Sequence, residues 1–332
     1  MKNTGWFIGI AFLSLLLIGG CGLLSSDDND DALPGTLVFS AQDEAGKNQI
    51  FTMRPDGSGL RQLTDMNGSS VQPSWSPAGQ QIVFSSFNQH TSVGPALWVM
   101  NADGSGLRPL HDFEPESERT SALNGNNPRW SPGGTKIAFD LCVNCQVSTN
   151  HAIFVFDLET EQLTRLTEVP VGYQSSVPRW SPDGNRIAFI ANRDYVDADT
   201  LRFRRDLYVM DAYGSNQTRV TETGYPGGYV WMNSNTLIQA VTDRDTNHKD
   251  VLLLEVETGQ TTPIMENLEV RNQFWVFWDI VNQQLLTTNK NHQKLPVTIA
   301  SYDLNGKILK QYQLNTSVLQ SGFGFDWKVN TE

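Results

Sequence analysis

The segment PRWSPDGNRIAF occupies residues 178–189, and the same pattern occurs twice more, as PSWSPAGQQIVF at 73–84 and PRWSPGGTKIAF at 128–139. In each copy a tryptophan precedes a Ser-Pro-x-Gly turn, in which proline presets φ and glycine tolerates a positive φ. A short run of strand-forming residues follows the turn, such as Ile187-Ala188-Phe189. A catalytic motif is usually needed once, so three copies indicate a structural repeat.

Each repeat contains four short strands. The tryptophan strand and the strand after the turn are followed by a third strand, such as 207–210, and then by a further turn and a short polar-apolar strand. Six tryptophans mark the repeats: Trp75, Trp130, Trp180, Trp231, Trp278 and Trp327. They are separated by 55, 50, 51, 47 and 49 residues. A period near 50 with four strands per unit predicts an all-β fold, a six-bladed β-propeller. We expect the tryptophans to pack between blades rather than to form a ligand cage.

The two ends of the repeat region complement each other. Residues 36–40 form an expected strand that has no tryptophan before it, whereas residues 325–329 supply a tryptophan strand with no room for a further blade after it. We therefore predict a propeller over residues 36–330 whose first blade combines three N-terminal strands with one C-terminal strand. Such sharing closes the ring and leaves only short protected edges. A seven-bladed ring is the alternative, but no seventh tryptophan unit is present.

The repeats resemble those of the TolB-type β-propeller family, which carries P-x-W-S-P-D-G-x-x-I-A-F and I-Y-V-M-x-x-D-G-S units. The resemblance covers roughly residues 36–330 and is degenerate in the last three copies. It implies the propeller fold, an envelope compartment and a protein-docking role of the Tol-Pal kind. The chain departs from the family's best-known member because it lacks an N-terminal α/β domain and carries a lipobox, so a direct Tol-Pal role does not follow.

The N-terminus has the features of a bacterial lipoprotein signal. Lys2 supplies a positive charge, residues 7–18 form an apolar stretch, and Leu17-Ile18-Gly19-Gly20-Cys21 resembles a lipobox. We predict a signal peptide over 1–20 and a lipidated Cys21, followed by an acidic tether over 21–35. An ordinary signal peptide or an uncleaved anchor is the alternative. Gly22 after the cysteine, by resemblance to enterobacterial lipoproteins, favours the outer membrane, facing the periplasm.

Charge and cysteine content narrow the class of protein. The 24 basic and 36 acidic residues give a net charge of −12, and an acidic chain without a basic stripe is a poor nucleic-acid binder. With Cys21 lipidated, Cys142 and Cys145 remain, and they lie in an expected hairpin loop. In an oxidising compartment we predict a disulfide between them; two reduced structural thiols are the alternative.

We find no catalytic elbow, zincin motif or nucleotide-binding loop, so we predict no enzyme activity and no cofactor. The five histidines are scattered, and we expect no metal site. Related propellers cleave oligogalacturonides with a histidine-bound metal, but here no histidine directly precedes a blade tryptophan. Two acidic loops offer a less favoured calcium site, with these candidate ligands: Asp197, Asp199, Asp243 and Asp245.

Aromatic residues precede the tryptophans of the last three repeats, where the innermost strand of a blade begins at a mouth of the central channel. We predict that Tyr229, Phe274 and Phe323 form an aromatic rim that binds an envelope protein or a peptide. Core packing is the alternative for these residues. A carbohydrate- or small-ligand-binding lipoprotein and a propeller lyase or hydrolase remain competing functional hypotheses.

Overall fold

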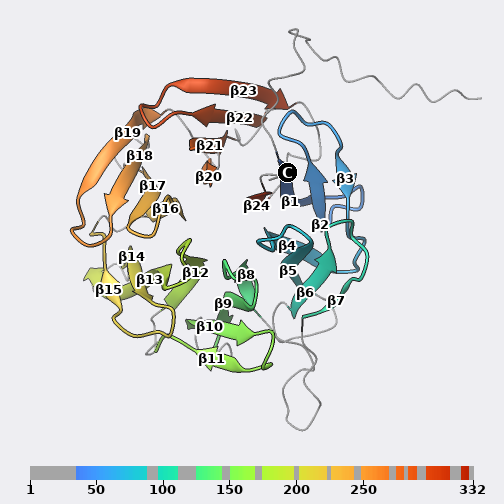
Figure 1. Cartoon of the computed structure of the whole chain (residues 1–332), viewed down its shortest axis with the longest axis horizontal. Coiled ribbons are helices and arrows are strands. Elements are labelled where there is room, and N and C mark those ends of the chain that lie inside the picture. The colour runs from blue at the N-terminus through green and yellow to red at the C-terminus, as the bar shows by residue number, and fades with distance from the viewer. Residues whose placement is uncertain are drawn as a thin grey trace, which may run out of the picture. The chain divides into compact units, whose positions relative to one another are not determined.

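The computed structural model describes residues 35–87, 96–110, 125–143, 150–168, 174–197, 202–222, 226–242, 248–268, 274–279, 283–289, 297–314 and 323–328. The chain divides into two units, Met1–Asp31 and Ala32–Glu332, and all the described residues belong to the second. They form six four-stranded antiparallel sheets arranged as the blades of a propeller (Figure 1). The described part of the chain contains no helix with the length and hydrophobicity needed to cross a membrane.

We number the blades 1 to 6, and each contains four strands that follow one another from the central channel outward. The strands at each level are given below in blade order. The innermost strands are β24 (Phe323–Lys328), β4 (Ser69–Trp75), β8 (Asn126–Trp130), β12 (Gln174–Trp180), β16 (Pro226–Trp231) and β20 (Phe274–Asp279). The second strands are β1 (Thr36–Gln42), β5 (Gln81–Phe87), β9 (Lys136–Cys142), β13 (Arg186–Asp197), β17 (Thr236–Thr242) and β21 (Gln284–Asn289). The third strands are β2 (Asn48–Met53), β6 (Ala96–Asn101), β10 (His151–Asp157), β14 (Arg202–Asp211), β18 (Lys249–Glu255) and β22 (Val297–Tyr302). The outermost strands are β3 (Arg61–Gln62), β7 (Arg108–Pro109), β11 (Leu163–Arg165), β15 (Thr218–Arg219), β19 (Thr261–Leu268) and β23 (Ile308–Leu314).

The first blade confirms the predicted closure of the ring. Strand β24 pairs antiparallel with β1, and the register places Trp327 opposite Leu37 and Phe325 opposite Phe39. Each innermost strand also contacts the innermost strand of the next blade, all the way round from β4 to β24 and back to β4. The six-bladed, four-stranded architecture expected from the sequence is therefore confirmed, including in the degenerate blades 5 and 6.

The hydrogen bonds of the repeated Ser-Pro-x-Gly turn account for several of its residues. In blade 4 the amide of Gly184 donates to the carbonyl of Ser181 over 2.9 Å, and Gly184 has a φ of 72°. The carboxylate of Asp183 accepts hydrogen bonds from the Ser181 hydroxyl at 2.6 Å and the Asn185 amide at 3.1 Å. Serine and glycine therefore recur in the turn that joins the innermost and second strands, and Asp183 adds two hydrogen bonds in blade 4 that Ala78 and Gly133 do not provide in blades 2 and 3.

Six hydrophobic clusters hold the ring together, one between each pair of neighbouring blades. The cluster between blades 3 and 4, for example, joins Ile153 and Leu166 to Ile187 and Phe189. The blade tryptophans pack in these clusters: Trp75 and Trp231 are buried, and Trp130, Trp180 and Trp278 are partly buried. The side chain of Trp327 lies outside the described part of the structure. Burial of such large apolar surfaces is the main attraction between blades.

Candidate functional site in the central channel

The innermost strands of blades 2, 3 and 4 share a left-handed kink three residues before the tryptophan. Gln72, Asn127 and Val177 have φ values of 57°, 51° and 56°, and each precedes a proline. The pairing register shifts at the same place in all three blades. Neither glycine nor a simple turn accounts for these angles, and a left-handed β-branched residue such as Val177 is a true outlier. Backbone strain of this kind persists only where the surroundings hold it in place.

Hydrogen bonds from the neighbouring blades hold Val177 in its strained conformation. Its amide donates to Oδ1 of Asp140 in blade 3 over 3.0 Å, and its carbonyl accepts a hydrogen bond from the hydroxyl of Tyr229 in blade 5. The same Asp140 oxygen accepts from the side-chain amide of Asn127 at 2.8 Å, and its other oxygen lies 2.9 Å from Nδ1 of His151. A polar belt therefore links the innermost parts of blades 3, 4 and 5.

This belt corrects one sequence prediction. Tyr229 is 4% exposed and packs in the hydrophobic cluster between blades 4 and 5. Its hydroxyl also lies 3.2 Å from the carbonyl of Ala188, and burial raises the pKa of the phenol above its ordinary value. Tyr229 is therefore a structural residue, and its prediction as an exposed rim aromatic is wrong.

The residue directly before the tryptophan differs between blades and brings charge into the channel. It is Arg179 in blade 4 and Asp326 in blade 1. These two blades face each other across the ring (Figure 1), and the guanidinium and carboxylate interact electrostatically. An interaction between opposite blades acts across the channel. Asp326 also accepts a hydrogen bond from the Trp75 amide at 2.7 Å.

Arg179 carries an incompletely compensated charge. Burial lowers the pKa of its guanidinium, and the negative charge of Asp326 acts in the opposite direction. Arginine remains protonated in proteins, so the cost of desolvation is carried by a charged group. None of the described residues accepts a hydrogen bond from this guanidinium, although the backbone carbonyl of Arg179 accepts one from the Trp231 indole at 3.0 Å. The five N–H donors of the guanidinium are therefore free of acceptors among the described residues.

Arg129 occupies the same place in blade 3 and is 8% exposed. One of its terminal nitrogens donates to the carbonyls of Pro128 at 2.8 Å and Pro73 at 3.3 Å, whereas its buried Nε has no partner among the described residues. Neighbouring innermost strands therefore each carry an arginine with spare donors. This arrangement suits a carboxylate or another planar anion, which guanidinium groups bind through paired hydrogen bonds.

The other predicted site residues are only partly placed. Phe274 and Phe323 begin strands β20 and β24, but their side chains lie outside the described part, as does that of Asp197 at the end of β13. Cys21, Cys145, Asp199, Asp243 and Asp245 lie outside the described residues altogether. Cys142 is disulfide-bonded, and its pairing with Cys145 stays a prediction. Within the described ranges no group of three or more His, Cys, Asp or Glu residues could hold a metal ion.

Comparison with known proteins supports the fold. No family model matches the chain. The Tol-Pal system protein TolB of Nitratidesulfovibrio vulgaris is 38% identical over 56 residues, which are 17% of this chain and 13% of that protein. The crystal structure of TolB from Acinetobacter baumannii matches with a TM-score of 0.64 at 16% identity, over 88% of this chain and 66% of that one. Oligogalacturonate lyase from Vibrio parahaemolyticus matches with a TM-score of 0.54 at 12% identity, over 85% of this chain and 75% of that one.

These findings define the chain as a six-bladed β-propeller with a charged central channel. TolB structures share its fold, and a 56-residue segment is similar in sequence to the TolB protein of Nitratidesulfovibrio vulgaris. The chain spans just under two thirds of the Acinetobacter protein, and the curated relative is matched over a short segment only. Structural likeness at these identities concerns the fold, on which both binding proteins and enzymes are built.

Proposed function

We propose that this protein is a docking module of the bacterial cell envelope, in which the mouth of the propeller channel binds a segment of another protein. The observation that carries this proposal is the Arg179 side chain of an innermost strand, which is partly buried and donates no hydrogen bond to the described residues. Burial also lowers the pKa of its guanidinium. A buried cation is stabilised when an anion replaces the water it has lost. The partner segment therefore presents a carboxylate, from an acidic side chain or a chain terminus.

The rest of the channel suits a peptide segment. Asp326 opposes Arg179 and would repel a second carboxylate, so a bound segment has one preferred orientation. The kinked strands of blades 2 to 4 are held rigid by hydrogen bonds between blades, so little order is lost on binding. Phe274 and Phe323 start two innermost strands and are proposed to provide apolar contacts at the rim.

Two observations of different kinds support the proposed location in the cell envelope. The lipobox ending at Cys21 favours a lipid anchor, and Gly22 favours the outer membrane, facing the periplasm. The curated relative is named as a component of the Tol-Pal system, which favours an envelope role for a protein that shares its repeats. We propose that the acidic residues of the 21–35 tether keep the propeller at a distance from the membrane surface.

In-cell cross-linking of the full chain, followed by purification and mass spectrometry, tests the proposal. Wild type is compared with Arg179→Gln and with Arg108→Gln, a matched control on the exposed outermost strand of blade 2. We expect one envelope protein to be recovered with wild type and with the control, and to be lost with Arg179→Gln. Recovery of the same proteins from all three variants would contradict a channel-bound partner.

Catalysis is the competing hypothesis, because an oligogalacturonate lyase shares the fold. We propose binding rather than catalysis, and a lyase assay on oligogalacturonate with the purified chain checks this directly. Product formation that is lost in Arg179→Gln would replace the docking function with an enzymatic one.

A further inference from the structure

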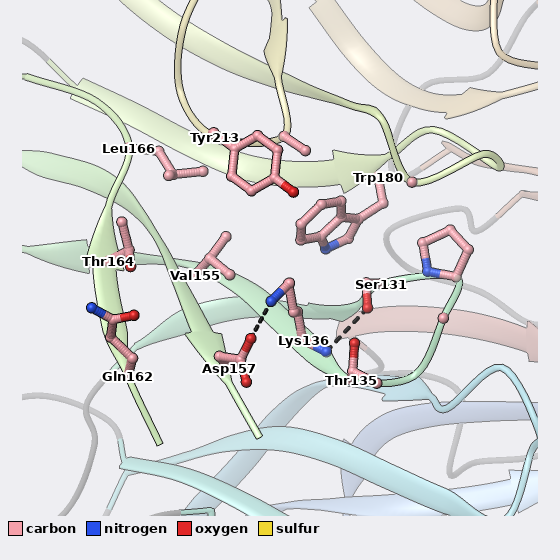
Figure 2. Close-up of a pocket in the computed structure, with 14 residues that line it drawn as sticks. Ser131, Thr135, Lys136, Val155, Asp157, Gln162, Thr164, Leu166, Trp180 and Tyr213 are labelled. Atoms are coloured by element: carbon pink, nitrogen blue, oxygen red, sulfur yellow. Dashed lines mark hydrogen bonds and ion pairs between the residues drawn. The ribbon is translucent and has the colours of Figure 1, made fainter. Parts of the chain in front are cut away.

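A second hollow lies away from the channel, between blades 3 and 4, on the side where the repeated turns emerge (Figure 2). Its volume is about 350 Å³, within the ~300–1,000 Å³ range of small-molecule sites. The rings of Trp180 and Tyr213 from blade 4 lie across it from Lys136 and Asp157 of blade 3, while Gln162 and Thr164 line one side.

The neighbouring interface explains why a pocket exists here. Between blades 4 and 5, Arg186 lies over the ring of Trp231, with its guanidinium carbon 5.7 Å from the centroid. The same guanidinium pairs with Glu257 of blade 5 at 2.7 Å and donates to Asn235 at 2.7 Å. Arg186 thereby covers the tryptophan and joins the two blades.

The equivalent residues between blades 3 and 4 cannot make that bridge. Lys136 corresponds to Arg186 and Trp180 to Trp231, since they hold the same places around the repeated turn. Tyr213 stands where blade 5 has Glu257, and among the described residues Lys136 has no acidic partner across the interface. Lys136 pairs instead with Asp157 of its own blade, and that carboxylate has its pKa lowered by the ion pair. The ring of Trp180 is left to line the pocket.

Tyr213 also differs in kind from the residues that hold its position in the other blades, which are acidic or an asparagine. The corresponding residues in blades 1 and 2 are Asp56 and Asp103, whose carboxylates accept the amides of Ser58 at 2.8 Å and Ser105 at 2.9 Å. Tyr213 supplies no such acceptor and is 86% exposed. An exposed aromatic ring at a position that is otherwise polar, at the edge of a pocket that also holds Trp180, is placed to contact a ligand.

We propose that this pocket binds a single pyranose ring of a neutral saccharide. The weakly polar C–H face of a sugar packs on aromatic rings, while its hydroxyls both donate and accept hydrogen bonds. Trp180 and Tyr213 offer the rings, and Lys136, Asp157, Gln162 and Thr164 offer donors and acceptors at the edges. The ammonium and carboxylate compensate each other, so the pocket has no excess charge and favours an uncharged ligand.

Saturation-transfer NMR and calorimetric titration of the full chain test this proposal. The probes are methyl β-D-glucopyranoside, methyl β-D-galactopyranoside and N-acetyl-D-glucosamine. Tyr213→Glu recreates the pairing seen for Arg186 and Glu257, draws Lys136 over Trp180, and is expected to weaken binding by about tenfold or more. Tyr213→Asp restores the residue that blades 1 and 2 use, so it removes the ring while favouring the turn, and is expected to have the same effect.

The matched control is Phe87→Glu, which replaces another exposed aromatic, on strand β5 of blade 2, and is expected to bind like wild type. Binding of a hexoside identifies a neutral glycan as the source, and preferential binding of N-acetyl-D-glucosamine identifies an amino-sugar polymer. The proposal is overturned if none of the three probes binds, or if both Tyr213 variants bind as tightly as wild type. Because Arg179 is not part of this pocket, the result is independent of the channel experiment.

Discussion

The hydroxyl of Tyr229 donates a hydrogen bond to the carbonyl of Val177, so a buried phenol of blade 5 secures a strained residue of blade 4. Replacement of Tyr229 by phenylalanine removes the hydroxyl, so the Val177 carbonyl loses this hydrogen bond. We expect Tyr229→Phe to lower the free energy of unfolding by about 1–3 kcal/mol. Denaturant unfolding measures the change, with the exposed Tyr213→Phe as the control that should be neutral.

The same phenol predicts a pH dependence. Burial raises the pKa of Tyr229 in the folded protein above the ordinary value of 10.0, so the folded state keeps a proton that the unfolded state loses. Stability from this group is therefore complete below about pH 10 and declines as the pH rises further. Wild type should lose stability more steeply than Tyr229→Phe as the pH rises above about 10. Parallel slopes for the two proteins would show that the phenol is not protected by the fold.

Asp140 is the centre of the polar belt, since it is 2% exposed and accepts hydrogen bonds from Asn127 and Val177. Asp140→Asn keeps the shape but turns half of the acceptor into a donor. We expect a loss of about 1.5–3 kcal/mol in unfolding free energy, because hydrogen bonds to a charged group are lost. Thermal and denaturant melts measure it against Glu159→Gln, an exposed control. A loss as small as that of the control would mean that the belt does not stabilise the ring.

Gly306 and Gly46 form a natural pair for measuring contact between blades. Both have a φ of 75°, but a Cβ on Gly306 would lie 2.5 Å from the carbonyl oxygen of Ile264 in blade 5, whereas a Cβ on Gly46 meets nothing within 4 Å. Alanine at Gly46 should cost about 1–2 kcal/mol from backbone strain alone. Gly306→Ala should cost at least about 1 kcal/mol more, because overpacking is added. Equal melting temperatures would contradict the close approach of blades 5 and 6.

Removal of residues 323–332 deletes strand β24 and exposes the edge of β1. We expect a fall in melting temperature of roughly 10 °C or more and a tendency to associate through the free edge. Removal of residues 329–332 alone leaves β24 intact and is the matched control. Scanning fluorimetry and size-exclusion chromatography distinguish the outcomes, and two variants that behave alike would argue against closure by β24.

Much of the ring was predictable because its signals are local. The Ser-Pro-x-Gly turn fixes the step from the innermost to the second strand, and the tryptophan spacing counts the blades. Sharing of the first blade followed from an unmatched strand at each end of the repeats. These features depend on turn chemistry and periodicity, which are written in consecutive residues.

The channel was less predictable than the ring. Tyr229 and Trp231 lie two residues apart in an uninterrupted stretch of pairing with β17, so they share one face of β16, and both are 4% exposed. The register shift lies before Tyr229, so strand alternation counted from the tryptophan places Tyr229 in the core and not at the rim. The left-handed Val177 has no sequence signal, since a residue before proline is expected to be extended. The left-handed conformation of Val177 is held by hydrogen bonds to Asp140 and Tyr229, which belong to other blades.

The sequence does contain an indication of the pocket between blades 3 and 4, but only an alignment of the repeats shows it. Tyr213 occupies a position that is aspartate in blades 1 and 2, and this substitution is the clue. The sequence does not predict that Lys136 forms an ion pair with Asp157 of its own blade and not with a residue across the interface.

The pairing of β24 with β1 sets the order of events when the chain folds. The two strands that complete blade 1 lie at opposite ends of the propeller sequence, so their contact closes the longest loop in the molecule. Blades 2 to 6 can form from local hairpins, but the last step waits for the C-terminal residues and is expected to limit the folding rate. Until then β1 is an open edge, and this interval is when misassembly competes with ring closure.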